Sequence, residues 1–223
     1  MEKLIQGLEY FQTEVFPRER ELFAHLAHHH EPHAMMITCA DARIDPSHLL
    51  QTSPGELFML RNAGNMVPAY TSGLGAEAAT IEYAMSVLKL KHIIVCGHTD
   101  CGAMRAVLKP ETASGMHAVQ NWLTHASCAR RIVQDRYGRE EEPVRLRRLV
   151  EENVMAQLVN LHTHPSVASR LLSGAVHLYG WVYEIGTGQI HAYDPGSNEF
   201  RPLQPGDSFQ DLPAMRLALA LTD

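Results

Sequence analysis

Three residues of metal-binding type lie at the ends of two apolar segments of the chain or shortly after them. Cys39 ends the segment 34–39, and His98 and Cys101 follow the segment 93–97. Two thiolates and one imidazole form a common ligand set for zinc, which has no redox chemistry and prefers four ligands. Three protein ligands leave the fourth position open, and this arrangement is typical of catalytic zinc sites. The sequence therefore predicts one zinc ion per chain, bound by Cys39, His98 and Cys101.

Two charged residues, Asp41 and Arg43, follow the first cysteine at alternate positions. Asp41 can take the fourth zinc position and block catalysis. Alternatively, it can accept the proton of a zinc-bound hydroxide and orient that oxygen toward a substrate. Arg43 can hold the carboxylate in a bidentate pair, which keeps it ionised and off the metal. A plain surface ion pair is the less favoured interpretation, and Asp100 is expected simply to point to solvent.

The two thiolates also determine the pH dependence that we expect. They formally cancel the charge of a zinc ion, so the pKa of its bound water should lie above ~7, toward the ~9 of the aqueous ion. Activity is therefore expected to rise with pH between these values.

The hydrophobic pattern predicts strands that alternate with helices. The strands are expected at 34–39, 57–61, 93–97, 176–183 and 189–193, and the helices at 77–90, 102–108, 116–137, 144–162 and 165–174, with two more in 2–30 and a short one possible at 215–221. This order favours an α/β fold with a mostly parallel central sheet, helices on both faces and an antiparallel edge strand. Ligand sites of such sheets lie at the carboxyl ends of the strands, where Cys39 and His98 fall.

The whole-chain properties suit one domain spanning 1–223. The chain has 223 residues, 45% of them hydrophobic, and a formal net charge of −6 without a basic stripe, so nucleic acid is not an expected partner. The sequence has no apolar run of membrane-spanning length and no leader-like segment at 1–10, so no membrane association and a cytoplasmic location are expected. Cys96 and Cys128 are expected to be buried as small hydrophobic residues rather than to bind metal.

Several short motifs resemble the β-class carbonic anhydrases, in particular their plant-like and cyanobacterial carboxysomal branch. They are Cys-Ala-Asp-Ala-Arg at 39–43, Pro-Gly-Glu-Leu-Phe at 54–58, Arg-Asn-Ala-Gly-Asn at 61–65, Ile-Glu-Tyr-Ala at 81–84 and Cys-Gly-His-Thr-Asp-Cys-Gly-Ala-Met at 96–104. The resemblance implies zinc on Cys39, His98 and Cys101, and an Asp41–Arg43 dyad. It also implies reversible hydration of CO₂ to bicarbonate by zinc-bound hydroxide.

The same resemblance implies a homodimer or a dimer of dimers. Residues 1–30 would form a helical arm over the partner, with the active site at the subunit interface. Phe58, Ala63 and Tyr83 would line the substrate pocket, to which we add Gly102 and His30. His30 stands where the branch usually has a glutamine. Met36 replaces the tryptophan of the bicarbonate-regulated branch, and no long C-terminal extension is present, so carboxysome-shell partners are not expected.

Other functions remain open at this point. A related zinc hydrolase of carbonyl sulfide or carbon disulfide would use the same chemistry. A catalytically silent zinc-containing scaffold is a candidate from another class, but it would need neither Asp41 nor Arg43. The pattern at Gly73, Gly75 and Ala78 resembles a dinucleotide-binding motif, yet it does not follow a predicted strand, and close helix packing explains it better.

Overall fold

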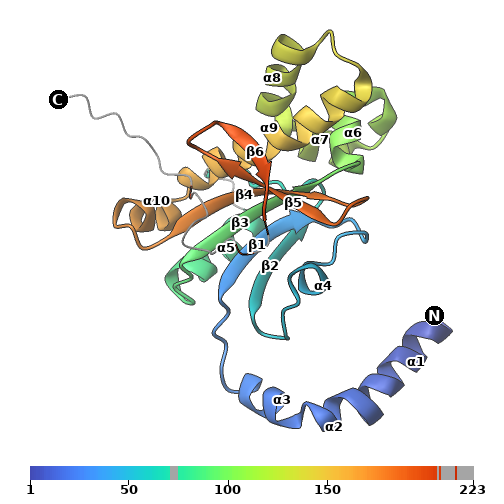
Figure 1. The fold of residues 1–223 in the computed structure, drawn as a ribbon, viewed down its shortest axis with the longest axis vertical. Helices are drawn as coiled ribbons and strands as arrows, with labels where there is room; N and C mark the ends of the chain where they lie inside the picture. The colour runs from blue at the N-terminus through green and yellow to red at the C-terminus, as the bar shows by residue number, and fades with distance from the viewer. Residues whose placement is uncertain (71–74, 205, 207–213, 215–223) are drawn as a thin grey trace.

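The computed structural model describes residues 1–70, 75–204, 206 and 214 (Figure 1). Within these residues, one sheet is formed by β1 (Ala34–Cys39), β2 (Leu57–Asn62), β3 (His92–His98), β4 (His177–Glu184), β5 (Gln189–Asp194) and β6 (Glu199–Pro202). The order of the strands is β2-β1-β3-β4-β5-β6. The pairs from β2 to β4 are parallel, and β5 and β6 are antiparallel to their neighbours. The predicted α/β fold with a mostly parallel sheet and antiparallel strands at one edge is confirmed.

Helices connect the parallel strands and precede the first one. The longer ones are α1 (Glu2–Tyr10), α3 (Arg20–Leu26), α5 (Ala76–Ser86), α6 (Gly102–Leu108), α7 (His117–Leu123), α8 (Ser127–Tyr137), α9 (Glu142–His162) and α10 (Pro165–Leu172). Shorter pieces are the π-helix η1 (Phe11–Val15), α2 (Phe16–Arg18), α4 (Pro46–Leu50), and the 3₁₀ turns η2 (Pro110–Ala113) and η3 (Thr124–Ala126). No described helix combines the length and the apolar character needed to cross a membrane.

Two glycines allow α9 to lie close to the centre of the sheet. A Cβ atom on Gly97 of β3 would come within 2.9 Å of Val154, and one on Gly180 of β4 within 2.9 Å of Leu158. Real Cβ atoms do not approach so closely, so either these side chains or the helix that carries them would have to shift. All six residues of β1 are buried, because this strand lies inside the sheet and packs into the core.

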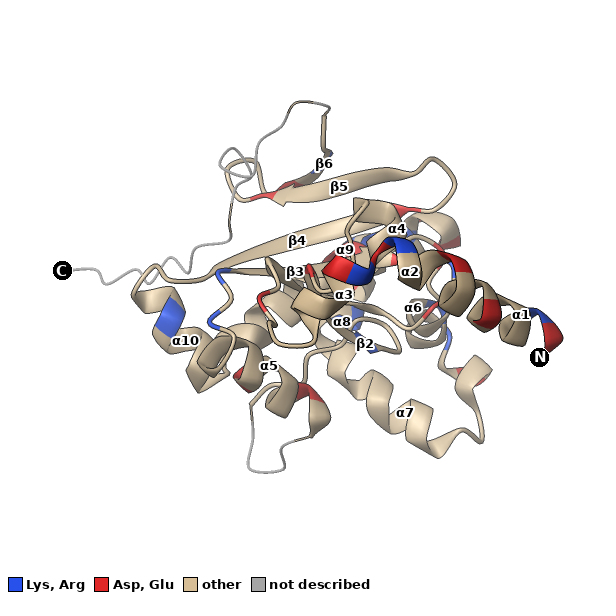
Figure 2. Ribbon diagram, turned by 90° about the horizontal axis from the view of Figure 1, so that it is seen from below, with Lys and Arg blue, Asp and Glu red and all other residues tan. Residues whose placement is uncertain are grey.

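The N-terminal helices stand apart from the sheet as an arm, as expected. None of the residues in α1, α2 or α3 is buried, and α1 reaches the periphery of the molecule in both views (Figures 1 and 2). Acidic and basic residues occur along the arm (Figure 2). Its apolar side chains Leu4, Ile5 and Leu8 are 53–67% exposed. Within the part of the chain that the structure describes, no side chain of the arm is therefore buried.

Several helix boundaries differ from the predicted ones; α5, for example, ends at Ser86 rather than at 90. Pro17 does not begin a new helix, because α1 continues through the π-helix η1 into α2 and the break comes at Glu19. Pro17 has no N–H to donate to the regular hydrogen-bond pattern of an α-helix, and the wider π turn before it accommodates the loss of that bond. The predicted helix 116–137 is interrupted by the 3₁₀ turn η3, which separates α7 from α8.

Some expectations were wrong or incomplete. Cys96 is buried as expected, but Cys128 is exposed, because α8 packs inward through Ala129 and Val133 instead. The short elements α4 and β6 were not predicted. The possible helix at 215–221 and Gly73 of the glycine motif lie outside the described residues.

Candidate metal centre

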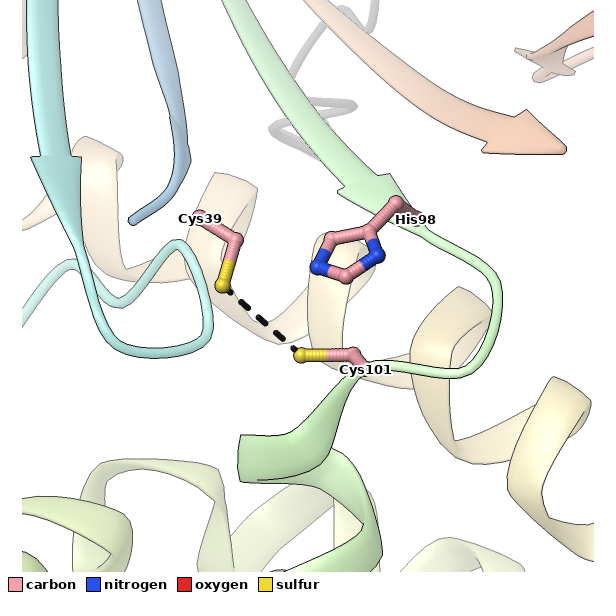
Figure 3. A group of neighbouring side chains, drawn as sticks. All are labelled: Cys39, His98 and Cys101. Atoms are coloured by element: carbon pink, nitrogen blue, oxygen red, sulfur yellow. Dashed lines mark hydrogen bonds between the residues drawn. The ribbon is translucent and has the colours of Figure 1, made fainter. Parts of the chain in front are cut away.

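The three predicted ligands meet at the carboxyl ends of β1 and β3 (Figure 3). The register pairs Thr38 with Cys96, so Cys39 and His98 end neighbouring parallel strands. Cys101 arrives from the turn after β3 and caps the start of α6. Their donor atoms all lie within 4.8 Å of one another, and the three residues are buried. The topology of the sheet thus converts a long separation in sequence into one compact cluster.

The histidine presents one free nitrogen to this cluster. Nδ1 of His98 lies 2.9 Å from the carbonyl oxygen of Thr99, to which it donates when Nδ1 carries the proton. Nε2 is then an acceptor, and it is buried without a hydrogen-bond partner among the described residues. Buried polar atoms normally have a partner, and histidines that bind metals are typically oriented by such a backbone carbonyl. A metal ion would satisfy this nitrogen.

The two thiols interact directly. Their Sγ atoms are 3.9 Å apart, too far for a disulfide bond, and the dashed line in Figure 3 marks this contact. The hydrogen bond from Cys101, with help from His98 and the Gly64 N–H, lowers the pKa of Cys39. The same contact raises the pKa of Cys101. Both sulfurs can be thiolates together only beside a cation, so the donor set suits zinc.

Asp41 lies beside the cluster and is held by Arg43. Nη2 and Nε of Arg43 donate to Oδ2 and Oδ1 of Asp41 at 2.7 and 3.0 Å, and the Arg43 N–H donates to Oδ1 at 2.9 Å. These contacts keep the pKa of Asp41 well below its usual range. Oδ2 of Asp41 is 3.8 Å from Nε2 of His98. The carboxylate is therefore ionised and adjacent to the ligands, while its two oxygens are engaged by the arginine.

Arg61 fixes the backbone that carries this dyad. Its guanidinium donates to the carbonyl oxygens of Cys39, Asp41 and Ile44 at 2.8–3.1 Å. No residue pattern in the sequence indicates these contacts, since every residue carries a backbone carbonyl group. Arg43 also donates to the side chain and the carbonyl of Asp100. The expectation that Asp100 simply points to solvent was therefore wrong.

Buried polar side chains of α9 hold the loop after β2 against the cluster. The amide of Asn153 donates to the carbonyl of Gly64 at 3.0 Å, and the Val67 N–H donates to Gln157 at 2.8 Å. On the other side, Nε1 of Trp122 donates to the carbonyl of Ala63 at 2.8 Å. These contacts fix the Gly64 N–H, which lies 3.4 Å from the Cys39 sulfur.

The five expected pocket residues fall into two groups. Ala63 and Gly102 lie next to the ligands, since Gly102 follows Cys101 and Ala63 precedes Gly64. Phe58 pairs with Met35 in the sheet, whereas Cys39 pairs with Asn62. Phe58 therefore lies four positions before the end of the strand that faces Cys39, a distance of ~13 Å.

His30 and Tyr83 belong to the group of Phe58. Their ring centroids lie 5.9 and 6.0 Å from that of Phe58. A single chain therefore brings together the ligands, the dyad, Ala63 and Gly102, but it leaves His30, Phe58 and Tyr83 at a distance from them.

Comparison with known proteins agrees with this geometry. Residues 34–190 match the family described as carbonic anhydrase. A carbonic anhydrase of Synechococcus elongatus is 44% identical over 191 residues, which cover 85% of this chain and 70% of the relative. The solved β-carbonic anhydrase CcaA is 40% identical, with a TM-score of 0.89, and the match covers 91% of this chain and 99% of that one.

A second solved structure bears on assembly. One of two tetrameric β-carbonic anhydrases from Sordaria macrospora is 26% identical, with a TM-score of 0.77, and the match covers 86% of this chain and 95% of that one. Together with the family match across most of the chain and the ligand cluster at the strand ends, these likenesses lead to one conclusion. The chain is an enzyme of the carbonic anhydrase family and belongs to its β class.

Proposed function

We propose that this carbonic anhydrase binds one zinc ion through Cys39, His98 and Cys101 and hydrates CO₂ reversibly at that ion, with Asp41 and Arg43 as its catalytic dyad. The observation that carries the proposal is the buried cluster of three donor atoms within 4.8 Å, which includes a histidine nitrogen that has no hydrogen-bond partner among the described residues. Zinc held by these three residues would supply a Lewis acid, which lowers the pKa of a bound water molecule.

The roles of the protein residues follow from their contacts. Asp41 is ionised, so it acts only as a hydrogen-bond acceptor and can orient a donor placed beside the ligands. Arg43 holds both carboxylate oxygens and thereby opposes movement of Asp41 onto the metal. Arg61 keeps the intervening backbone in place. The protein thus supplies a fixed acceptor rather than a group that must change its protonation near neutral pH.

We also infer that a second copy of the chain completes the pocket. His30, Phe58 and Tyr83 form a continuous aromatic group that lies away from the ligands of the same chain. The arm of residues 1–26 carries exposed apolar side chains suited to packing on another subunit. A homodimer, alone or paired into a tetramer, would bring the aromatic group of one chain to the metal centre of the other.

The proposal is tested by elemental analysis together with stopped-flow CO₂ hydration. We expect about one zinc ion per wild-type chain and near-complete loss of zinc and activity in Cys101→Ala, because two protein ligands hold zinc poorly. Cys128→Ala is the matched control, since Cys128 is exposed on α8 and should retain both. Wild-type protein without zinc, or an active Cys101→Ala variant, would contradict the assignment.

A further inference from the structure

The Asp41–Arg43 pair is part of a longer row of alternating charges. Nη1 of Arg43 donates to Oδ2 of Asp100 at 3.1 Å, and Nη2 donates to the Asp100 carbonyl at 3.0 Å. The other oxygen of Asp100, Oδ1, forms an ion pair with Arg105. The row Arg105–Asp100–Arg43–Asp41 therefore runs from α6 to the edge of the ligand cluster.

The backbone at Asp100 directs this residue toward Arg43. Asp100 has a φ of +57°, in the left-handed region that only Asn, Asp and Gly adopt readily. The conformation occurs in the tight turn between His98 and Cys101, and it aims both the side chain and the carbonyl of Asp100 at the same guanidinium. Arg105 is positioned by the first turn of α6, where its N–H donates to the Cys101 carbonyl at 2.9 Å.

Arg43 needs these additional contacts if it is to hold Asp41 still. The side chain of Arg43 is 48% exposed, and a single ion pair at such a site contributes little because solvent screens it and the long side chain loses entropy. Contacts with two carboxylates and one carbonyl restrict the guanidinium far more, since each alternative rotamer would break several of them.

We propose that Asp100, held by Arg105, is a positioning residue that fixes Arg43 and, through it, the orientation of Asp41. The proposal rests on the proposed catalytic role of Asp41. In this arrangement Asp100 acts through its contacts with Arg43. Its effect is to keep the Asp41 carboxylate in one place beside the metal ligands.

The test is Asp100→Asn, because asparagine has the same size and tolerates the left-handed backbone but lacks the charge. We expect kcat to fall about tenfold, with KM within twofold and the zinc content unchanged, because small misplacement of a catalytic group lowers the rate strongly. Arg105→Gln should shift kcat in the same direction by less. Asp135→Asn is the matched control, since it removes an exposed carboxylate that pairs with Arg131 at 2.7 Å on α8; it should leave kcat unchanged.

A double-mutant cycle separates positioning from a general structural effect. If Asp100 acts through Arg43, Asp100→Asn should lower kcat no further in an Arg43→Gln background. A crystal structure of zinc-loaded Asp100→Asn should also show Arg43 in a second rotamer, or its Nη2 more than 2.7 Å from Oδ2 of Asp41.

Each opposing outcome has a distinct meaning. Unchanged kcat in Asp100→Asn, a full additional loss in the Arg43→Gln background, or loss of zinc with unchanged activity per zinc ion would overturn the inference. Asp41→Asn is measured in parallel. If that variant is fully active, the proposed role of Asp41 fails; if it is inactive while Asp100→Asn equals wild type, only the inference about Asp100 fails.

Discussion

At the residue scale, the two oxygens of Asp41 are held by an arginine while the carboxylate lies beside the metal ligands. Oδ2 is 2.7 Å from Nη2 of Arg43 and 3.8 Å from Nε2 of His98. Because Arg43 keeps the pKa of Asp41 well below its usual range, this carboxylate stays ionised across the whole neutral range. Any change of activity between pH 6 and 9 must therefore come from another group.

The first prediction concerns Asp41→Asn. The substitution keeps the shape of the side chain but replaces one acceptor oxygen with a donor, so CO₂ hydration should fall at least ~100-fold while the zinc content stays the same. In the wild type, the rate should rise from pH ~7 to ~9, because two thiolates offset the charge that would otherwise lower the pKa of a metal-bound water. Stopped-flow assays across this range, with zinc analysis of each sample, check both statements. A flat wild-type profile or an active variant would contradict the mechanism.

The ligand residues could be predicted from the sequence, and their surroundings could not. Thiolates and imidazole reveal their chemistry by residue type, and the strand-end rule brings Cys39 and His98 together without further information. The contacts of Asp100 depend instead on the sign of one φ angle, and those of Arg61 on three backbone carbonyls. Neither leaves a recognisable spacing in the sequence.

At the scale of helices and strands, the distance between α9 and the sheet depends on two glycines. Gly97 and Gly180 lie on the adjacent strands β3 and β4, and the side chain of Val154 on α9 packs against both glycines. The same helix carries Asn153 and Gln157, which hold the loop beside the metal ligands. Close packing of α9 therefore stabilises the fold and also holds the loop after β2 in position beside the metal ligands.

The second prediction is that Gly180→Ala destabilises the protein by about 1–3 kcal/mol, since the added methyl group would overlap Leu158 and Val154 in a packed core. Chemical denaturation followed by circular dichroism measures the change. Gly186→Ala is the matched control, because a Cβ there meets nothing within 4 Å, and its stability should stay close to that of the wild type. Equal stability of the two variants would show that α9 adjusts freely.

The third prediction compares neighbouring glutamates of α9. Burial raises the pKa of Glu152, whose nearest arginine nitrogen, on Arg136, is 3.9 Å away. For an acid with a raised folded-state pKa, the stabilising contribution is present at low pH and is lost as the pH rises through that pKa. Glu152→Gln should therefore raise Tm by about 2 °C at pH 7 and have less effect near pH 4.

Glu151→Gln should act in the opposite direction. Glu151 pairs with Arg148 at 2.8 Å and Arg147 at 3.4 Å, and its side chain is only 11% exposed. Removing its charge leaves both arginines without this partner and should lower stability by about 0.5–1 kcal/mol at pH 7. Calorimetry of both variants at pH 4 and 7 provides the comparison. A loss of Tm in both variants at pH 7 would show that Arg136 compensates for the burial of Glu152.

The order and type of the main elements could be read from hydrophobic periodicity, but the short elements could not. α4 has only five residues, too few for a periodic pattern, although Pro46 at its start and the capping carboxylate of Asp45 are local signals of a helix N-terminus. The break between α7 and α8 has no proline or glycine. It lies beside Trp122, whose bond to Ala63 comes from tertiary structure.

At the scale of the whole molecule, two features of the single chain favour association with a second copy. Its arm exposes a row of apolar side chains and has no buried residue in its α-helices. Its aromatic group of His30, Phe58 and Tyr83 lies apart from its own metal ligands. Association with a second copy would cover the first feature and give the second a function at the partner's metal centre.

The last prediction tests whether the aromatic group serves the partner. The double variant His30→Ala/Tyr83→Ala changes two exposed side chains and should retain zinc but lose most activity, as should Asp41→Asn. Co-expression with two different tags yields hybrid dimers of these two chains. If the pocket is completed across the interface, one site of each hybrid has a wild-type metal centre and a wild-type aromatic group. The purified hybrid should then show about half of the wild-type activity, since one of its two sites is intact. If His30 and Tyr83 instead act within their own chain, every site of the hybrid carries a defect, and its activity will not exceed the mean of the two parent variants.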